Sequence, residues 1–337
     1  MSLTNDSISV LNDFSHLPGR DSEAINLGIS GCLAGQAVRF NRGHSRCLLF
    51  NNQTKEVFNF IPFCPEVAAG FGTPRPAMRL TGTSDNARLV ISQSTEIDVT
   101  QQLIEGFSKK MHEFRLLDGY LLKRDSPSCG LDRVKLYRPE EKQPFSKEGQ
   151  GIFASALQQA YPNLPLEDEG RIHDEAIRES FIIRVFAHHD FRTQVMPNLS
   201  FAELQKYHSR YKYLLMAHNQ KKVALLGRLI AGSKREELDK VAQSYFLIFM
   251  SVLGERSNPA KHSNVLFHIL GHLKKLVNAE ARQKIVKSIL DYRKGALPRI
   301  VPVELLKHYV EQKGDPFVSS QQYLKAYPKA FGLNHIL

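Results

Sequence analysis

The sequence predicts an α/β domain with a mostly parallel, Rossmann-like or flavodoxin-like sheet, followed by an all-α helical domain. Over residues 24–168, short apolar runs that end in Gly- and Pro-containing loops alternate with helical patterns. From residue 171 onward, apolar residues recur mainly at helical spacing. The 337 residues are also about twice the length of a typical domain, which favours two domains.

The predicted strands of the first domain are its short apolar runs. They cover residues 24–30, 56–63, 87–93 and 118–123. A helix is predicted over residues 98–117, with Asp98 as a candidate cap. Three of the four runs lead directly into irregular Gly- or Pro-containing loops. Because parallel sheets form their sites beyond the carboxyl ends of strands, these loops are the candidate site.

The boundaries of the two domains follow from composition. A polar leader covers residues 1–23, the first domain residues 24–168 and the helical domain residues 171–337. The prolines and acidic residues of 161–170 resemble a linker. Helices are predicted over residues 198–218, 264–278, 281–295 and 301–312. The first of these begins with Ser200 and Glu203, a capping-box pattern.

Composition and charge limit the classes of function that the protein could have. The chain has neither an apolar run long enough for a membrane span nor a secretory signal pattern, so we expect a cytoplasmic protein without a membrane partner. Residues 1–165 hold 18 Lys and Arg against 17 Asp and Glu, a net of +1, whereas residues 166–337 hold 27 against 17, a net of +10. A positive field confined to one half attracts polyanions such as RNA, although a solvated surface or an acidic protein partner would explain it too.

Cysteine usage points to a metal or to catalysis. Four cysteines in a cytosolic chain of this length do not suggest disulfides. Cys32, Cys64 and Cys129 lie in three separate loops, 32 and 65 residues apart, so only the fold could bring them together. Scattered buried cysteines are the alternative. Cys47 lies outside these loops and is interpreted as an ordinary thiol.

The loop sequences SGCLAGQAVRF, PFCPEVAAGFGTPRP and LKRDSPSCG resemble the three signature segments of the 2-thiouracil desulfidase family. The resemblance covers residues 24–165 and implies a 4Fe-4S cluster ligated by Cys32, Cys64 and Cys129, with the fourth iron lacking a protein ligand. Iron held by thiolates is a soft Lewis acid, and an open position on it can accept a thiocarbonyl sulfur in preference to a carbonyl oxygen. Attack of water on the ring carbon would then replace sulfur by oxygen without net redox change.

Such a hydrolysis needs groups that move protons. Glu66, two residues after Cys64, is the candidate general acid/base, because a carboxyl beside an apolar pocket should be protonated more easily than in water. The family motif pairs Glu66 with Ser126, and Ser128 is the competing hydroxyl. Four further basic residues could hold a phosphate or a charged ring, or could be structural: Arg39, Arg75, Lys123 and Arg124.

Residues 190–330 resemble the YbgA-like domain (DUF1722) that often follows a desulfidase domain. Proteins with this arrangement resemble tRNA 4-thiouridine desulfidases, in which the second domain is thought to bind RNA. Candidate phosphate contacts are Arg210, Lys221, Lys222, Arg228, Lys274, Lys275, Lys287, Arg293 and Lys294. Tyr207, Tyr211 and Tyr292 could stack on bases, but core positions are the stronger interpretation.

Three hypotheses remain. The first is a desulfidase that converts 4-thiouridine in tRNA to uridine and hydrogen sulfide; the second is a desulfidase of free thiouracil, a small thiolated base, with a structural helical half. The third is a noncatalytic RNA-binding redox sensor. His268 and His272, four residues apart on one predicted helix, could also ligate a metal, although packing or RNA contact is favoured. The oligomeric state does not follow from the sequence.

Overall fold

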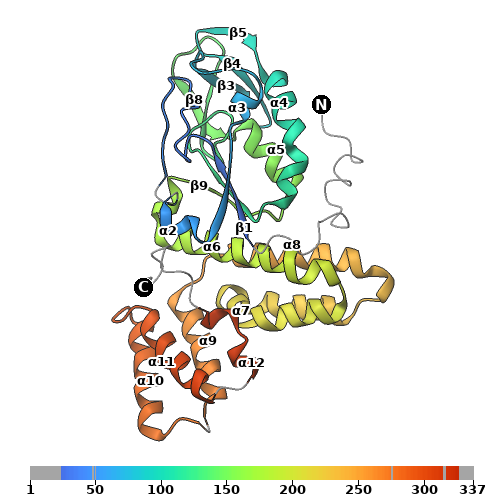
Figure 1. Ribbon diagram of the computed structural model, residues 1–337. Helices are drawn as coiled ribbons and strands as arrows, with labels where there is room; N and C mark the ends of the chain where they lie inside the picture. Colours follow the sequence, from blue (N-terminus) through green and yellow to red (C-terminus); the bar gives the residue numbers. More distant parts are fainter. Residues whose placement is uncertain (1–23, 48, 50, 275, 314–315, 326–337) are drawn as a thin grey trace. The chain divides into compact units, whose positions relative to one another are not determined.

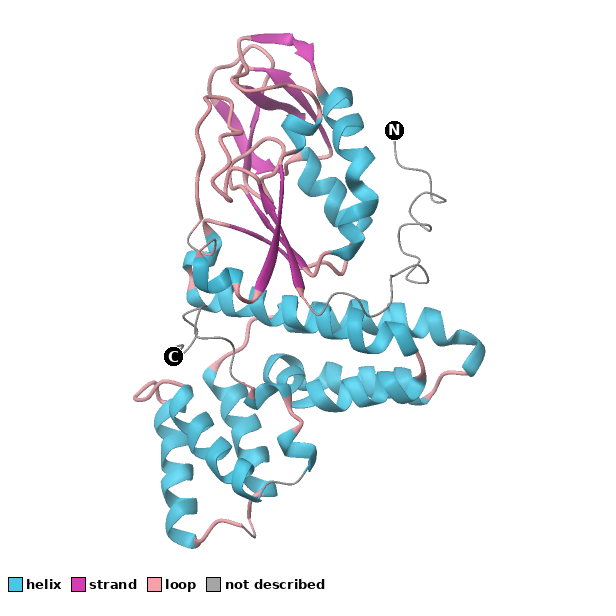
Figure 2. Cartoon of the chain, in the orientation of Figure 1, coloured by secondary structure: helices cyan, strands magenta, loops and turns pink. Residues whose placement is uncertain are grey.

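The computed structural model describes residues 24–47, 49, 51–274, 276–313 and 316–325 (Figure 1). The leader at residues 1–23 and Lys275 lie outside the described residues. The chain divides into two compact units, Met1–His189 and Asp190–Leu337. The first combines strands and helices and the second is mostly helical (Figure 2), which confirms the predicted fold class.

A four-stranded parallel sheet lies at the centre of the first unit. Its order is β2 (Phe58–Phe63), β1 (Ile25–Ser30), β6 (Gly119–Leu122) and β9 (Leu166–Asp168). Every residue of β1 and β6 is buried, as in parallel strands that are covered on both faces. The order 2-1-6-9 is the flavodoxin-like arrangement, in which the chain leaves β1 toward β2 and later returns to its other side.

A second, mixed sheet was not predicted. Its order is β5 (Ser94–Asp98), β4 (Asn86–Ile91), β3 (Met78–Thr83), β7 (Val134–Tyr137) and β8 (Pro144–Gly149). The expectation of one mostly parallel sheet was therefore incomplete. Only β4 has a continuous apolar run, whereas β5 and β8 are largely solvent-exposed and lack the apolar period of a buried strand.

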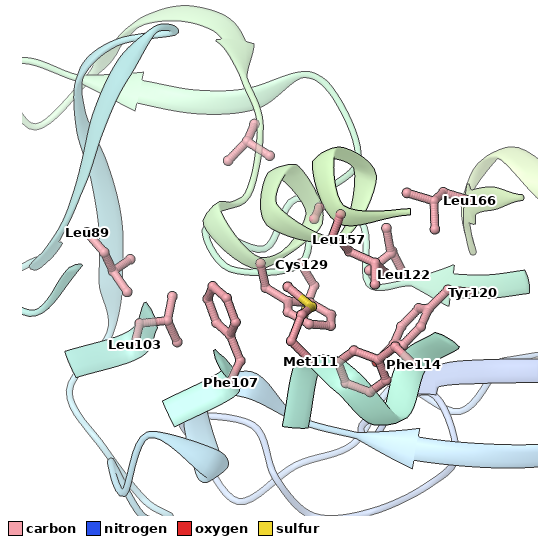
Figure 3. Close-up of a cluster of buried hydrophobic side chains, with 14 of the residues drawn as sticks. Leu89, Leu103, Phe107, Met111, Phe114, Tyr120, Leu122, Cys129, Leu157 and Leu166 are labelled. Carbon is pink, nitrogen blue, oxygen red and sulfur yellow. The ribbon is translucent and has the colours of Figure 1, made fainter. Parts of the chain in front are cut away.

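Helices cover the sheets of the first unit. They are α2 (Asn52–Lys55), α3 (Pro65–Ala68), α4 (Thr100–Met111), α5 (Ile152–Ala160) and α6 (Glu175–Asp190), with short 3-10 turns at His112–Leu116 and Arg171–His173. Side chains of α4, α5 and the strands form one apolar cluster that includes Cys129 and Tyr120 (Figure 3). The candidate site thus borders the main core of this unit.

The segment interpreted as a linker is part of the sheet. Strand β9 lies within residues 161–170, and its Glu167 and Asp168 are buried. Glu167 pairs with Arg171 at 3.0 Å, and Asp168 accepts hydrogen bonds from the backbone of Gly170 and Arg171, both at 2.8 Å. The linker interpretation was wrong because these partners allow acidic residues to be buried.

The second unit is built from helices. These are α7 (Phe201–Ala231), α8 (Leu238–Gly254), α9 (Pro259–His272), α10 (Ala279–Arg293), α11 (Ile300–Lys313) and α12 (Pro316–Ser319). Shorter turns lie at Phe191–Val195, Met196–Asn198, Arg235–Glu237 and Gln322–Leu324. Ser200 caps α7 as predicted, by accepting from the Glu203 amide at 3.2 Å, and α8 was missed. Among the described residues, no helix is long and apolar enough to cross a membrane.

The loop that carries Cys129 is fixed against the start of α5. The carbonyls of Pro127 and Ser128 accept from the first amides of α5, and Gly151 donates to the Gly130 carbonyl at 2.8 Å. A Cβ on Gly151 would lie 2.5 Å from the Ser128 carbonyl oxygen. Gly151 is therefore needed for this close approach.

We expect Gly151→Ala to lower the free energy of unfolding by about 1–3 kcal/mol, because the Cys129 loop must shift to make room. Urea unfolding of the full chain measures the change. Gly271→Ala is the matched control: its Cβ would meet nothing within 4 Å inside α9, so it should be neutral or slightly stabilising. Equal effects of the two substitutions would contradict the tight docking of this loop.

Candidate functional site

The three motif cysteines follow three neighbouring strands of the parallel sheet. Cys32 follows β1, Cys64 follows β2, and Cys129 lies in the loop after β6. Because β1 lies between β2 and β6, the three loops meet at the carboxyl edge of the sheet. The strand order reverses at β1, since the next strand, β2, lies on one side of it and the later strand β6 on the other. In open α/β sheets this switch point is the usual place of a ligand site.

The three thiols lie within electrostatic reach of one another. Burial and, to a smaller extent, the neighbouring Cys64 raise the pKa of Cys32 to about 11. Burial also raises the pKa of Cys129 well above its usual range, with smaller contributions from Cys64, Glu66 and Cys32. The fold therefore brings Cys32, Cys64 and Cys129 together. Cys47 is also buried, but it is not among the groups that shift these thiols.

Hydrogen bonds orient the sulfurs of Cys64 and Cys129. Burial raises the pKa of Cys64, while the amides of Val67 and Glu66 in α3 donate to its sulfur and oppose the shift. The Ser30 hydroxyl, at the end of β1, donates to the Cys129 sulfur. Sequence reasoning missed Ser30, since a small residue at the end of a buried strand gives no signal of its own.

Glu66 contacts Ser128 rather than Ser126. The Ser128 hydroxyl donates to Glu66 Oε1 at 2.8 Å and is fully buried. Ser126 Oγ instead accepts from the amides of Ser128 at 3.3 Å and Cys129 at 3.1 Å. Ser126 thus shapes the turn that presents Cys129, and the hydroxyl in contact with the candidate acid/base belongs to Ser128.

Arg75 holds Glu66 from the other side. Its Nε donates to Glu66 Oε2 at 2.8 Å, and its Nη2 makes a second contact to the same oxygen. The guanidinium also donates to the carbonyls of Gly72 at 2.8 Å and Val38 at 2.9 Å. With 9% of its surface exposed, Arg75 is engaged as a structural clamp and is not presented as a phosphate ligand.

The other predicted basic residues differ in their placement. Arg39 and Lys123 are close enough to Cys32 for their charges to oppose the rise in the pKa of its thiol. Lys123 also pairs with Glu169, which accepts from the Arg124 amide at 2.6 Å. The Arg124 side chain is exposed beside Asp125. Arg39 and Lys123 therefore border the thiols, and Arg124 lies further out.

The residues around the thiols fit an iron–sulfur cluster. Among the described residues, no three His, Cys, Asp or Glu side chains are arranged to hold a single metal ion, whose thiolate ligands would lie about 2.3 Å from it. Iron–sulfur clusters are held by Cys thiolates, and three cysteines meet at this sheet edge. The Tyr120 hydroxyl, fully buried, finds no hydrogen-bond partner in the described part of the chain. Burial raises its pKa well above the usual range, with smaller contributions from Cys129, Cys64 and Cys32. A buried donor of this kind fits an acceptor sulfur that the cluster would supply.

Comparisons with known proteins identify both halves. A family model described as 2-thiouracil desulfurase matches residues 27–169, and one described as a protein of unknown function (DUF1722) matches residues 212–328. The uncharacterised protein YbgA of Escherichia coli K12 is 32% identical over 158 residues, which are 47% of this chain and 94% of YbgA. The uncharacterised protein YbbK of Bacillus subtilis 168 is 30% identical over 150 residues, which are 42% of this chain and 95% of YbbK.

The N-terminal half of the chain belongs to the 2-thiouracil desulfurase family, and the C-terminal half is a DUF1722 domain. The desulfurase domain, residues 27–169, contains the three cysteines, Glu66, Ser126 and Ser128, so the resemblance stated from the motifs is confirmed. A solved structure of the 4Fe-4S-dependent thiouracil desulfidase TudS is 26% identical and has a TM-score of 0.36; the match covers 47% of this chain and 99% of TudS.

The DUF1722 domain and the short segment before it hold the candidate RNA contacts. Six of them are exposed: Lys221, Arg228, Lys274, Lys287, Arg293 and Lys294. Arg210 is half-buried and lies 3.9 Å from Asp190, and Lys222 pairs with Glu255 at 2.7 Å. These two have acidic partners inside their own unit, and Lys275 lies outside the described residues.

The aromatic and histidine candidates of this unit are mostly structural. Tyr207, Tyr211 and Tyr292 are buried, which confirms the core interpretation. His268 and His272 both lie near the Tyr213 ring, with ring centroids 6.4 Å away in each case. No described third ligand completes a metal site around them. Both histidines are solvent-exposed beside this ring.

Thiol alkylation measures the shifted pKa of Cys32. With a pKa of about 11 instead of the usual 9.0, the thiolate fraction at pH 8 falls about a hundredfold. In the cofactor-free protein, the iodoacetamide labelling rate of Cys32, followed by mass spectrometry, should therefore keep rising about tenfold per pH unit beyond pH 9. In urea the same rate should level off near pH 9. A native profile that also levels near pH 9 would contradict the buried, mutually coupled site.

Proposed function

We propose that this protein is a cytoplasmic 4Fe-4S-dependent desulfidase that removes sulfur from 4-thiouridine in tRNA to give uridine and hydrogen sulfide. The observation that carries the proposal is the convergence of Cys32, Cys64 and Cys129 at one sheet edge beside the hydrogen-bonded pair Glu66 and Ser128. Membership of the desulfurase family supports the same chemistry.

The donor set fits the proposed cluster. Cys32, Cys64 and Cys129 would be its three protein ligands, and the fourth iron would have none. When bound, the cluster would supply a soft Lewis acid for the thiocarbonyl sulfur. Tyr120 would donate to a sulfur acceptor, and Ser30 and the amides of α3 would orient the ligand sulfurs. The loss of thiol protons on loading would couple cofactor binding to pH.

Glu66 and Ser128 would move the protons of the hydrolysis. Water adds oxygen to the ring carbon, the carbon–sulfur bond breaks, and the two water protons leave with sulfur as hydrogen sulfide, so no electrons are exchanged. Glu66 would accept a proton released by water, directly or through the Ser128 hydroxyl that already donates to it. Arg75 fixes the second carboxylate oxygen, which keeps Oε1 directed at Ser128.

The basic helical half supports RNA as the substrate. Residues 166–337 hold 27 basic against 17 acidic residues, and six of the candidate phosphate contacts are exposed side chains. Phosphate contacts of this kind would position a thiolated nucleotide without reading its sequence. A free thiouracil carries no phosphate that these residues could contact.

Two serine substitutions separate turn formation from proton transfer. We expect Ser128→Ala to lower kcat about 10- to 100-fold at unchanged iron and sulfide content, since it removes the donor to Glu66. Ser126→Ala should instead lower the iron content, because it removes the acceptor of the Cys129 amide. The opposite pattern would indicate that Ser126, and not Ser128, provides the catalytic hydroxyl. Glu66→Gln should lower kcat at least as much as Ser128→Ala.

The substrate is tested by anaerobic incubation of cluster-reconstituted protein with bulk tRNA and, separately, with free 2-thiouracil. Loss of thiocarbonyl absorbance and release of sulfide are followed, with Cys129→Ala as the inactive control. Lys274→Glu/Arg293→Glu/Lys294→Glu should strongly reduce turnover of tRNA but not of thiouracil, and Lys109→Glu/Lys142→Glu in the desulfurase domain is the charge control. Turnover of thiouracil alone would make the helical half a scaffold, and no turnover of either would favour the redox-sensor hypothesis.

A further inference from the structure

A second cationic surface lies on the desulfurase domain, in the loop that follows Cys32. Residues 33–46, here called the basic loop, contain Arg39, Arg42, His44 and Arg46 and no Asp or Glu. The rest of this domain is close to electrically neutral, so the cations are concentrated beside the thiols. The charge does not come from the helical half.

The basic loop is fixed to the site at both ends and in the middle. Its ends return to the strand edge through hydrogen bonds from the Ser45 amide to the Cys32 carbonyl at 2.8 Å and from Cys47 to Leu33 at 3.0 Å. Its middle is held by Arg75, whose amide donates to the Phe40 carbonyl at 3.0 Å and whose guanidinium donates to Val38. Arg75, which orients Glu66, therefore also fixes the position of the basic loop.

Four side chains of the basic loop, one aromatic and three basic, are exposed to solvent. Phe40 is 43% exposed, and Arg42, His44 and Arg46 are exposed as well. Arg39, Arg42 and His44 make no ion pair with any residue that the structure describes. The charge of Arg39 reaches the Cys32 thiol, so the cations extend from the edge of the site to solvent.

We infer that the basic loop binds the phosphodiester backbone beside the thiolated nucleotide and that Phe40 stacks on a flanking unpaired base. Guanidinium groups interleaved with an exposed aromatic ring are the features that single-stranded nucleic acid requires. An acidic peptide would use the cations but has no need of the exposed ring. The inference rests on the proposed function and adds a contact on the catalytic domain itself.

The test compares three substrates that share the reacting base: free 4-thiouracil, 4-thiouridine 5′-monophosphate and a pentanucleotide with central 4-thiouridine. The variants are Arg42→Gln/Arg46→Gln and Phe40→Ala in the full chain with its cluster. Phe40→Tyr retains the ring, and Lys109→Gln/Lys142→Gln removes two charges from segments that carry no site residue.

We expect the ratio of KM for the pentanucleotide to KM for the free base to rise about tenfold in each loop variant and to stay unchanged in Phe40→Tyr and in the charge control. A rise for the pentanucleotide alone assigns the loop to flanking phosphates, and an equal rise for the monophosphate assigns it to the substrate's own phosphate. An unchanged ratio for both phosphate substrates would overturn the inference.

A binding measurement separates this inference from the proposed function. Fluorescence anisotropy of a labelled, unthiolated pentauridine needs no turnover, so it remains informative if the wild type desulfurises nothing. Loss of two phosphate contacts should reduce the slope of log affinity against log salt by about 1.4 in Arg42→Gln/Arg46→Gln. Competition by polyglutamate as strong as by pentauridine, with no effect of Phe40→Ala, would make the loop a general anion surface and refute RNA stacking.

Discussion

The contact between Arg75 and Glu66 is the interaction on which the site depends most. The guanidinium is almost fully buried and joins the Glu66 carboxylate to the carbonyls of Gly72 and Val38. A buried cation needs a matching anion and satisfied donors, and here one arginine satisfies both needs while holding two loops. Loss of Glu66 would leave that charge uncompensated. A substitution at Glu66 therefore affects the loops as well as proton transfer, whereas one at Ser128 leaves the ion pair in place.

The sequence was informative where one short segment determines its own structure. Strands β1, β2 and β6 could be predicted because each is an apolar run that stops at a Gly- or Pro-containing loop, and each of those loops holds one of Cys32, Cys64 and Cys129. Parallel strands place such loops at a common edge. The meeting of the cysteines thus follows from local patterns together with one topological rule. The mixed sheet does not follow, because its edge strands are polar and are specified mainly by pairing with their neighbours.

The roles of Ser126 and Ser128 could not be distinguished from sequence. Both hydroxyls flank Pro127, and both lie within three residues of Cys129. The direction of each is set by the turn, whose carbonyls are fixed by the first amides of α5. That contact joins residues about 25 positions apart and depends on Gly151, which has no side chain. No local sequence pattern predicts such a contact. The burial of Glu167 also depends in part on a distant partner, Arg184, 4.0 Å from its carboxylate.

The site contains one group that a folded core normally avoids, a buried hydroxyl without a hydrogen-bond partner. This is the Tyr120 hydroxyl, which has no partner among the described residues and lies near three thiols with raised pKa values, of which Cys32 and Cys129 are buried and Cys64 is half-buried. Leaving such a donor unsatisfied costs about 1–3 kcal/mol. A cluster that accepts a hydrogen bond from Tyr120 would remove this cost. Because a ligand that binds only the folded state stabilises that state, binding of a cluster is expected to be coupled to folding of this domain.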